Sequence, residues 1–233
     1  MTDMVWVYLV LMVGACLQSV IGFGLGLLCA PVLFLIYPQL VPAPMILNAL
    51  FLTLLLSVRN IRAIDVKQTS VSVIGGTLGV GIAGLVMLYI EPYHYKFLLG
   101  STIILGVIAS FVGHKPVINL FTNLMASTLS GFMGTTTSAG GAPMGLLYQS
   151  AEHHKIKANL SVFFLYINIF GLIVLWYAGS AGYSDVVLFI QCIPAILLGW
   201  LMSEFMQNYI NNDIVRKLTL LASLISGIAS FFS

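Results

Sequence analysis

The sequence predicts an all-α, polytopic membrane protein, because it is too apolar for water, its apolar runs are long, and its pattern repeats once. Hydrophobic residues make up 60% of the 233 positions and charged residues 7%, and the mean hydropathy is +1.06. A soluble globular domain carries about 25% charged residues. Lipid must therefore cover most of the surface, and in lipid the backbone has to form helices or a closed barrel. The runs are continuous rather than alternating, which favours helices.

The same composition excludes several classes of function. The net charge of +2 is too small to indicate nucleic-acid binding. Cys16, Cys29 and Cys192 all fall in apolar stretches, with neither a disulfide framework nor a metal-ligand spacing. The adjacent His153 and His154 lack the i, i+4 spacing of a helical zinc pair. With no nucleophile–base pair, phosphate-binding loop or haem motif either, the sequence predicts neither an enzyme nor a cofactor.

Apolar segments follow one another along the whole chain. The first runs from Met4 to about Tyr37, which is too long for one span of about 20 residues, and it is interrupted by the glycines at 22–26 and by Pro31. Its beginning is interpreted as a membrane helix rather than a signal peptide, because Asp3 is its one charge and no cleavage site follows. The later segments are 45–58, 71–90, 97–112, 117–133, 144–149, 158–178, 186–205 and 218–232.

An internal repeat divides the chain into two membrane repeats of five segments each, 1–116 and 117–233, within one integral membrane domain. Each half has an apolar helix, a glycine-rich break, a short apolar run with a proline, and then an asparagine near the start of a further helix. The matching residues are Gly22-Phe23 with Gly131-Phe132, Ala30-Pro31 with Ala142-Pro143, and Asn48 with Asn159.

The distribution of Lys and Arg favours ten segments over eight spans. If the glycine-rich breaks are kinks, the eight spans divide the nine cations almost evenly between the two sides of the membrane. If the chain reverses at each break, Lys96 stands alone on one side and all the others share the opposite side, as the positive-inside rule expects. The two halves are then inverted repeats, both termini lie outside, and the cytoplasmic loops are 59–67, 113–116, 151–157 and 206–217.

The two glycine-rich breaks are the predicted binding site. Interrupted hydrophobic segments at matching positions in two halves indicate where a transporter binds its solute. The segments after the breaks are too short to span a hydrocarbon core of about 30 Å, so we expect half-helices or re-entrant pieces. A broken helix exposes N–H groups that need a partner in a membrane, and an anion can supply one. The candidate residues are Gly24, Gly26, Thr136, Thr137, Ser138, Gly140 and Gly141, with Asn48 and Asn159 lining or bracing the site.

Two alternatives stay open at this point. The glycines can simply pack helices closely, and Asn48 and Asn159 can be hydrogen-bonding links between helices. The other intramembrane amides, Gln18, Gln149, Asn168 and Gln191, are expected to make helix–helix hydrogen bonds. No Lys, Arg, Asp or Glu lies clearly in the middle of a membrane segment, which favours an anion or a neutral solute over a strongly hydrated cation.

The duplicated pattern of glycines, prolines and asparagines resembles the TauE/SafE family of sulfite exporters. The similarity covers essentially the whole chain in length, hydropathy and two-fold repetition. It implies a bacterial or archaeal inner-membrane permease for small sulfur-containing or carboxylate anions. Leu27, Leu28 and Cys29 stand where family members carry a denser glycine run, so the second half, with its threonine-rich turn, is expected to contribute more to binding.

The resulting expectation is a transporter for a small anion such as sulfite or an organosulfonate, working by alternating access within the lipid bilayer. Coupling to protons and assembly into a homo-oligomer are left open. A passive anion channel and a non-transporting membrane subunit or scaffold remain as alternatives.

Overall fold

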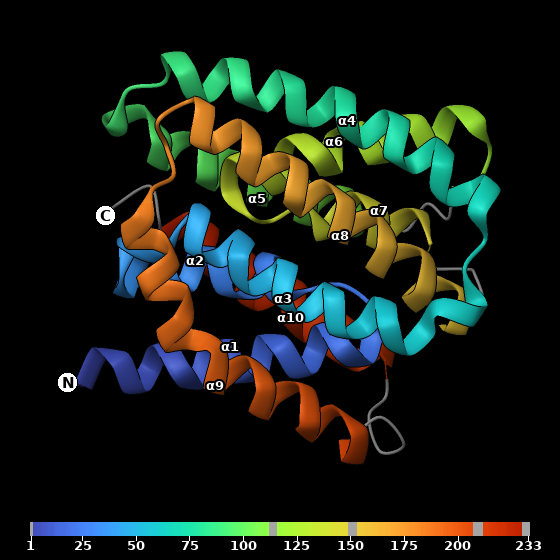
Figure 1. Ribbon diagram of the computed structural model, residues 1–233, viewed down its shortest axis with the longest axis horizontal. Helices are drawn as coiled ribbons and strands as arrows, with labels where there is room; N and C mark the ends of the chain where they lie inside the picture. Colours follow the sequence, from blue (N-terminus) through green and yellow to red (C-terminus); the bar gives the residue numbers. More distant parts are fainter. Residues whose placement is uncertain (1, 112–115, 149–152, 207–211, 230–233) are drawn as a thin grey trace.

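The structure is a bundle of long helices that encloses two short ones (Figure 1). The computed structural model describes residues 2–111, 116–148, 153–206 and 212–229, and within these residues it has ten α-helices, two 3-10 turns and no strand. The all-α fold class is thereby confirmed. The helices are α1 Thr2–Ile21, α2 Leu25–Ile36, α3 Ala43–Asn60, α4 Val66–Tyr89, α5 Pro92–Phe111, α6 Leu120–Thr137, α7 Gly141–Leu147, α8 His153–Tyr177, α9 Tyr183–Met206 and α10 Asn212–Ala229, with 3-10 turns η1 Pro38–Leu40 and η2 Ile61–Ala63.

The chain breaks, rather than kinks, at both glycine-rich segments. Gly22 and Gly24 separate α1 from α2 with φ angles of 91° and 127°, which L side chains rarely adopt. Ser138, with a φ of 62°, ends α6 before α7 begins. The 12 residues of α2 and the 7 of α7 rise only about 18 Å and 10 Å, so neither spans a hydrocarbon core of about 30 Å. In Figure 1, α1 and α3 run in the same direction, so the chain returns between them.

Five of the described helices are long and apolar enough to cross a membrane, which supports a multi-pass membrane protein. They comprise Met4–Ile21, Ala43–Asn60, Val66–Tyr89, Lys157–Tyr177 and Tyr183–Met206. α6 is absent from this set although it has 18 residues, because one side of it is polar. Its Asn123, Ser127 and Ser130 are buried against other helices instead of facing lipid.

The helices pack in a pattern that is the same for both halves of the chain. α4 packs on α6, and α9, its counterpart in the second half, packs on α1. In the same way α5 contacts α7 while α10 contacts α2, and α3 packs on α8 at the centre. This pairing is what two related halves would produce; their inverted relation and the boundary between 116 and 117 stay predictions.

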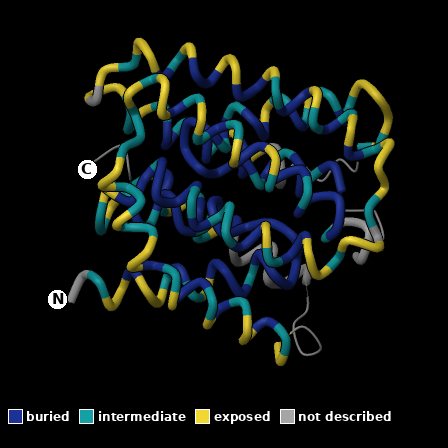
Figure 2. Tube along the Cα trace, viewed as in Figure 1, coloured by how far each residue is buried: buried dark blue, intermediate teal, exposed yellow. Residues whose placement is uncertain are grey.

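Glycine allows the closest of these helix pairs to form. A Cβ on Gly79 of α4 would lie far inside 3.0 Å of the Thr128 carbonyl oxygen of α6. A Cβ placed on Gly199 of α9 would likewise lie far inside 3.0 Å of the Met12 carbonyl oxygen of α1. Small residues let helix backbones approach in this way where lipid gives no hydrophobic drive for association. Figure 2 shows the result: the facing sides of the helices are buried, and the exposed positions lie on the outside of the bundle.

One end of the bundle carries most of the described cations. The turn between α3 and α4 lies at the right of Figure 1, whereas the start of α1 and the turns that follow α4 and α8 lie at the left. Arg59 at the end of α3 pairs with Glu204 near the end of α9, and the N–H of Asp65 donates to Asn159 Oδ1 near the start of α8. The cations at this end whose side chains the structure describes are Arg59, Arg62, Lys67 and Lys157.

Lys96 lies at the opposite end, on the first turn of α5, with its ammonium group over the rings of Tyr93 and Phe97. This distribution agrees with the predicted grouping of the basic loops. Residues 113–115, 151–152 and 207–211 of those loops lie outside the described residues. Which end faces the cytoplasm stays a prediction.

Candidate functional site

The two chain breaks meet in the middle of the bundle. A Cβ on Gly26, in the first turn of α2, would lie far inside 3.0 Å of the carbonyl oxygen of Ser138 between α6 and α7. A Cβ on Gly141 would lie 3.3 Å from Phe23 Cβ and 3.5 Å from the Gly24 nitrogen. The glycine-rich segments of both halves are therefore in direct backbone contact, which their separation in the sequence does not reveal.

A small cavity of about 30 Å³ lies where they meet. A buried water needs roughly 10–15 Å³ of such space, so the cavity holds about two waters or one small ion. Both halves of the chain contribute to its wall. The lining residues are Gln18, Phe23, Gly24, Gly26, Ala49, Ser130, Gly134, Ser138, Gly140, Gly141, Phe164, Ile167 and Asn168.

Five of the nine predicted site residues line this cavity, namely Gly24, Gly26, Ser138, Gly140 and Gly141. The other four do not: Thr136 and Thr137 face the neighbouring turn of α6, Asn48 lies beside the cavity-lining Ala49, and Asn159 lies at the basic end. The structure thus brings the glycines of both breaks together with Ser138 and leaves the other predicted side chains outside.

The hydroxyl groups near the cavity already donate to carbonyl oxygens. Thr136 Oγ1 donates to Phe132 O and Thr137 Oγ1 to Met133 O, each over 2.8 Å. Ser138 Oγ donates to Pro42 O over 2.9 Å. Ser130 Oγ, the other lining hydroxyl, donates to Gly140 O. A hydroxyl has one proton, so these groups can accept a hydrogen bond from a solute but have no proton left to donate.

The two predicted asparagines are held differently. Asn159 Oδ1 accepts from the Asp65 N–H over 2.8 Å, and its Nδ2 donates to Gln68 Oε1 over 3.2 Å. It therefore fastens the start of α8 to the start of α4. Asn48 Nδ2 donates to Pro44 O one turn back, and within the described residues its buried Oδ1 has no partner. Asn159 thus braces the bundle, and a role in binding stays a prediction for both.

The first turn of α2 leaves backbone donors beside the cavity. Gly24 is its N-cap and offers no side-chain cap, and the Leu25 N–H donates to Gln18 Oε1 over 3.1 Å. The N–H groups of Gly26 and Leu27 follow in the same turn, where no carbonyl of the helix can accept from them. The positive end of the helix dipole lies at the same place. This combination is suited to a negative charge.

Two carboxamides that were expected to link helices also line the cavity. Gln18 of α1 is 5% exposed and Asn168 of α8 is 8% exposed. Within the described residues, Asn168 makes no hydrogen bond. The signal for Gln18 was its position one helical turn before the break at Gly22. For Asn168 it was an amide midway along an apolar helix.

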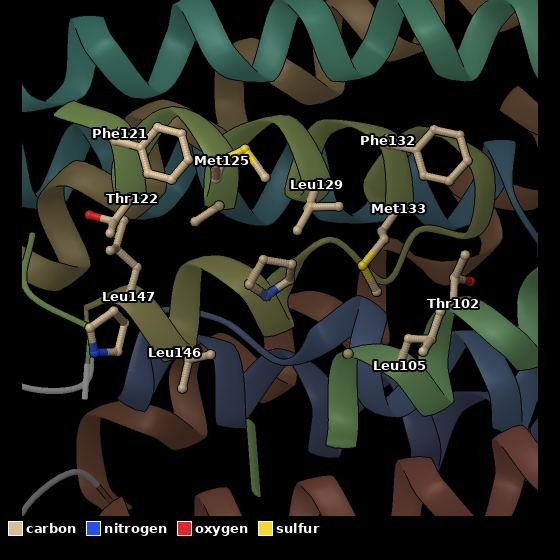
Figure 3. A pocket seen from close by; sticks show the side chains of 14 residues that line it. Thr102, Leu105, Phe121, Thr122, Met125, Leu129, Phe132, Met133, Leu146 and Leu147 are labelled. Carbon is tan, nitrogen blue, oxygen red and sulfur yellow. The ribbon is translucent and has the colours of Figure 1, made fainter. Parts of the chain in front are cut away.

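A second, larger pocket is of another kind. It measures about 600 Å³ and lies between α5, α6 and α7, where Figure 3 shows Phe121, Met125, Leu129 and Met133 of α6 along one side. Thr102 and Thr122 are the polar side chains of its lining, and they donate to Leu98 O and Val117 O. A groove with this lining is suited to hydrocarbon and has no donor for an anion.

Comparison with known proteins gives one match. The family model described as Sulfite exporter TauE/SafE matches residues 7–230, which is nearly the whole chain and includes both breaks. No curated protein and no solved structure matches the sequence.

Proposed function

Since the chain belongs to the sulfite exporter TauE/SafE family, whose members are membrane transporters, we propose that it carries a small anion across the bilayer by binding it between its two chain breaks. The family membership supplies the transporter class. The choice of anion, the binding residues and the mechanism are the proposal.

The observation that supports the binding site most strongly is the first turn of α2, where the N–H groups of Gly26 and Leu27 have no acceptor within the helix, beside a cavity that both halves line. Backbone N–H groups in a membrane need a partner, and here the remaining ones lie near the buried, unpaired amide of Asn168. Among the described residues, no charged side chain lines the cavity. A cation would find no carboxylate to offset its loss of water, whereas an anion finds N–H donors and the positive end of a helix.

Release of the anion requires the two halves to separate on one side of the cavity. The wall combines Gly24 and Gly26 of the first half with Ser138, Gly140 and Gly141 of the second. Rocking of one half against the other would open the wall toward each side of the membrane in turn, which is alternating access. The Arg59–Glu204 pair joins the halves at the basic end and would have to break for that end to open.

Sulfite uptake into proteoliposomes that contain the purified protein tests this function, with empty liposomes as the baseline and with or without an imposed pH gradient. We expect uptake that saturates with sulfite concentration, and a response to the gradient if protons are the coupling ion. Uptake that rises linearly without saturation would indicate a passive channel. Absence of uptake by folded protein, for sulfite and for other small anions, would indicate a non-transporting membrane subunit.

A further inference from the structure

We infer that Gln18 and Asn168 select the solute, and that the cavity admits a small inorganic oxyanion but no anion with an organic substituent. This inference rests on the proposed function and names the solute class for the same cavity. It assigns specificity to two residues outside the glycine-rich breaks, one from each half of the chain.

Two side chains of the cavity wall have hydrogen-bond donors that the described part of the protein does not already use. Its hydroxyls belong to Ser130 and Ser138, and both donate to backbone carbonyls. The remaining lining side chains are apolar, apart from Gln18 and Asn168. The N–H groups of these two carboxamides are therefore the side-chain donors that the described wall can offer to a solute.

Gln18 is held in a defined orientation. Its Oε1 accepts from the Leu25 N–H, and because an N–H can donate only to an acceptor, this bond places the oxygen toward α2. The two hydrogens of Nε2 are then left over. Gln18 both caps the first turn of α2 and presents its amide group beside the N–H groups of Gly26 and Leu27.

Asn168 of α8 is the second side-chain amide of the cavity wall. The residue Asn168 is more than nine-tenths buried, and its amide borders the cavity without a hydrogen bond among the described residues. A solute that accepts hydrogen bonds would satisfy it. Such a solute accepts from both halves at once, so its binding joins the parts of the wall that must separate during transport.

The size of the solute is limited by backbone atoms and aromatic rings in the cavity wall. The Gly26–Ser138 contact and the contact of Gly140 with the Ser130 carbonyl, 2.5 Å from a Cβ placed on Gly140, involve backbone atoms that cannot rotate away. The rings of Phe23 and Phe164 line other parts of the cavity. An extra carbon chain would fit only if α2 moved away from the α6–α7 turn or if one of the lining rings were made smaller. Sulfite needs no such movement.

The first test compares uptake of sulfite with uptake of ethanesulfonate, which carries a singly charged SO3 group on a two-carbon chain. Wild-type protein in proteoliposomes should take up sulfite and leave ethanesulfonate at the empty-liposome baseline. Phe164→Leu, which shortens one wall, should admit ethanesulfonate. Equal uptake of both anions by the wild type would overturn the size limit and leave the proposed transport function intact.

The second test changes the donors. Gln18→Glu keeps an oxygen for the Leu25 N–H but replaces the amide donor with a carboxylate, and should raise the KM for sulfite about tenfold or more. Gln68→Glu is the matched control, because it makes the same change outside the cavity, where an oxygen can still accept from Asn159. Asn168→Ala breaks no hydrogen bond of the described fold and should raise KM similarly in folded protein.

If the wild type takes up sulfite and the KM is unchanged in folded Gln18→Glu and Asn168→Ala proteins, the role of the two amides is refuted. The proposed transport function is then unaffected. Absence of sulfite uptake in the wild type would instead refute the proposed function together with this inference.

Discussion

At Gly26 the position that a Cβ would occupy is already filled by the carbonyl oxygen of Ser138. Gly140 is similar, since a Cβ there would meet Ser130 O and Gly134 Cα at 2.5 and 2.9 Å. Gly141 differs, because its nearest neighbours would lie at 3.3 Å or more and part of that contact is the Phe23 side chain. The glycines of the two breaks therefore tolerate substitution differently. Gly26 and Gly140 allow backbones to touch, whereas Gly141 mainly borders the cavity.

Replacing Gly26 with Ala should destabilise the protein, because a methyl group forced against backbone costs about 1–3 kcal/mol. For a chain of this length that corresponds to a fall in melting temperature of roughly 2–12 °C. Gly81→Ala is the control, since nothing lies within 4 Å of a Cβ there and Ala favours the helix. Thermal unfolding in detergent checks both; equal melting temperatures for Gly26→Ala and wild type would show that the breaks are not in contact.

At the scale of the elements, an ion pair joins the ends of α3 and α9, whereas close glycine contacts join α4 to α6 and α9 to α1. Arg59 and Glu204 make two contacts, one of them Nη2 to Oε2 at 2.9 Å. Their side chains are 34% and 38% exposed, so water screens the pair and its contribution to stability is small, about 0.2–1 kcal/mol. The pair joins a helix of the first half to a helix of the second at the basic end, and under the proposed mechanism it would hold that end closed.

Arg59→Glu and Glu204→Arg should each leave two like charges at the closed end and favour its opening. Each single variant should therefore change the transport rate, and the double charge swap should return it toward the wild-type value. Sulfite uptake by the four proteins, analysed as a double-mutant cycle, measures this coupling. Single effects that simply add in the double variant would show that the pair does not couple the halves.

For the whole molecule, we predict from the charge pattern that the end with Arg59, Arg62, Lys67 and Lys157 faces the cytoplasm. The opposite end, with Lys96 and the start of α1, would then face outward (Figure 1). Inverted halves and a site at their junction fit this orientation.

Cysteine labelling in intact cells tests the orientation with a reagent that cannot cross the membrane. Cys16, Cys29 and Cys192 are buried and should give a low background. A cysteine at the exposed Ser184, in the first turn of α9, should react from outside, whereas one at the exposed Arg62 should react only after permeabilisation. The reverse pattern would invert the topology.

The sequence predicted the elements better than the contents of the site. Long apolar runs and glycine-rich stretches are local signals, so the ten segments and the breaks beside Gly24 and Gly140 were predictable. The bond from Ser138 Oγ to Pro42 O joins distant parts of the chain, so no local pattern shows that this hydroxyl is already used. Gln18 and Asn168 were recognised as intramembrane amides, but which face of each helix meets the other half depends on packing.

Sulfite uptake by Gly141→Ala, compared with Gly81→Ala, tests the central claim most directly. At Gly141 a methyl group fits against Phe23 and the Gly24 nitrogen at 3.3–3.5 Å, so the protein should fold while the cavity becomes smaller. We expect Gly141→Ala to lose most of its sulfite uptake and Gly81→Ala to retain the wild-type rate and KM. Wild-type uptake by a folded Gly141→Ala protein would contradict the claim that the anion binds between the two breaks.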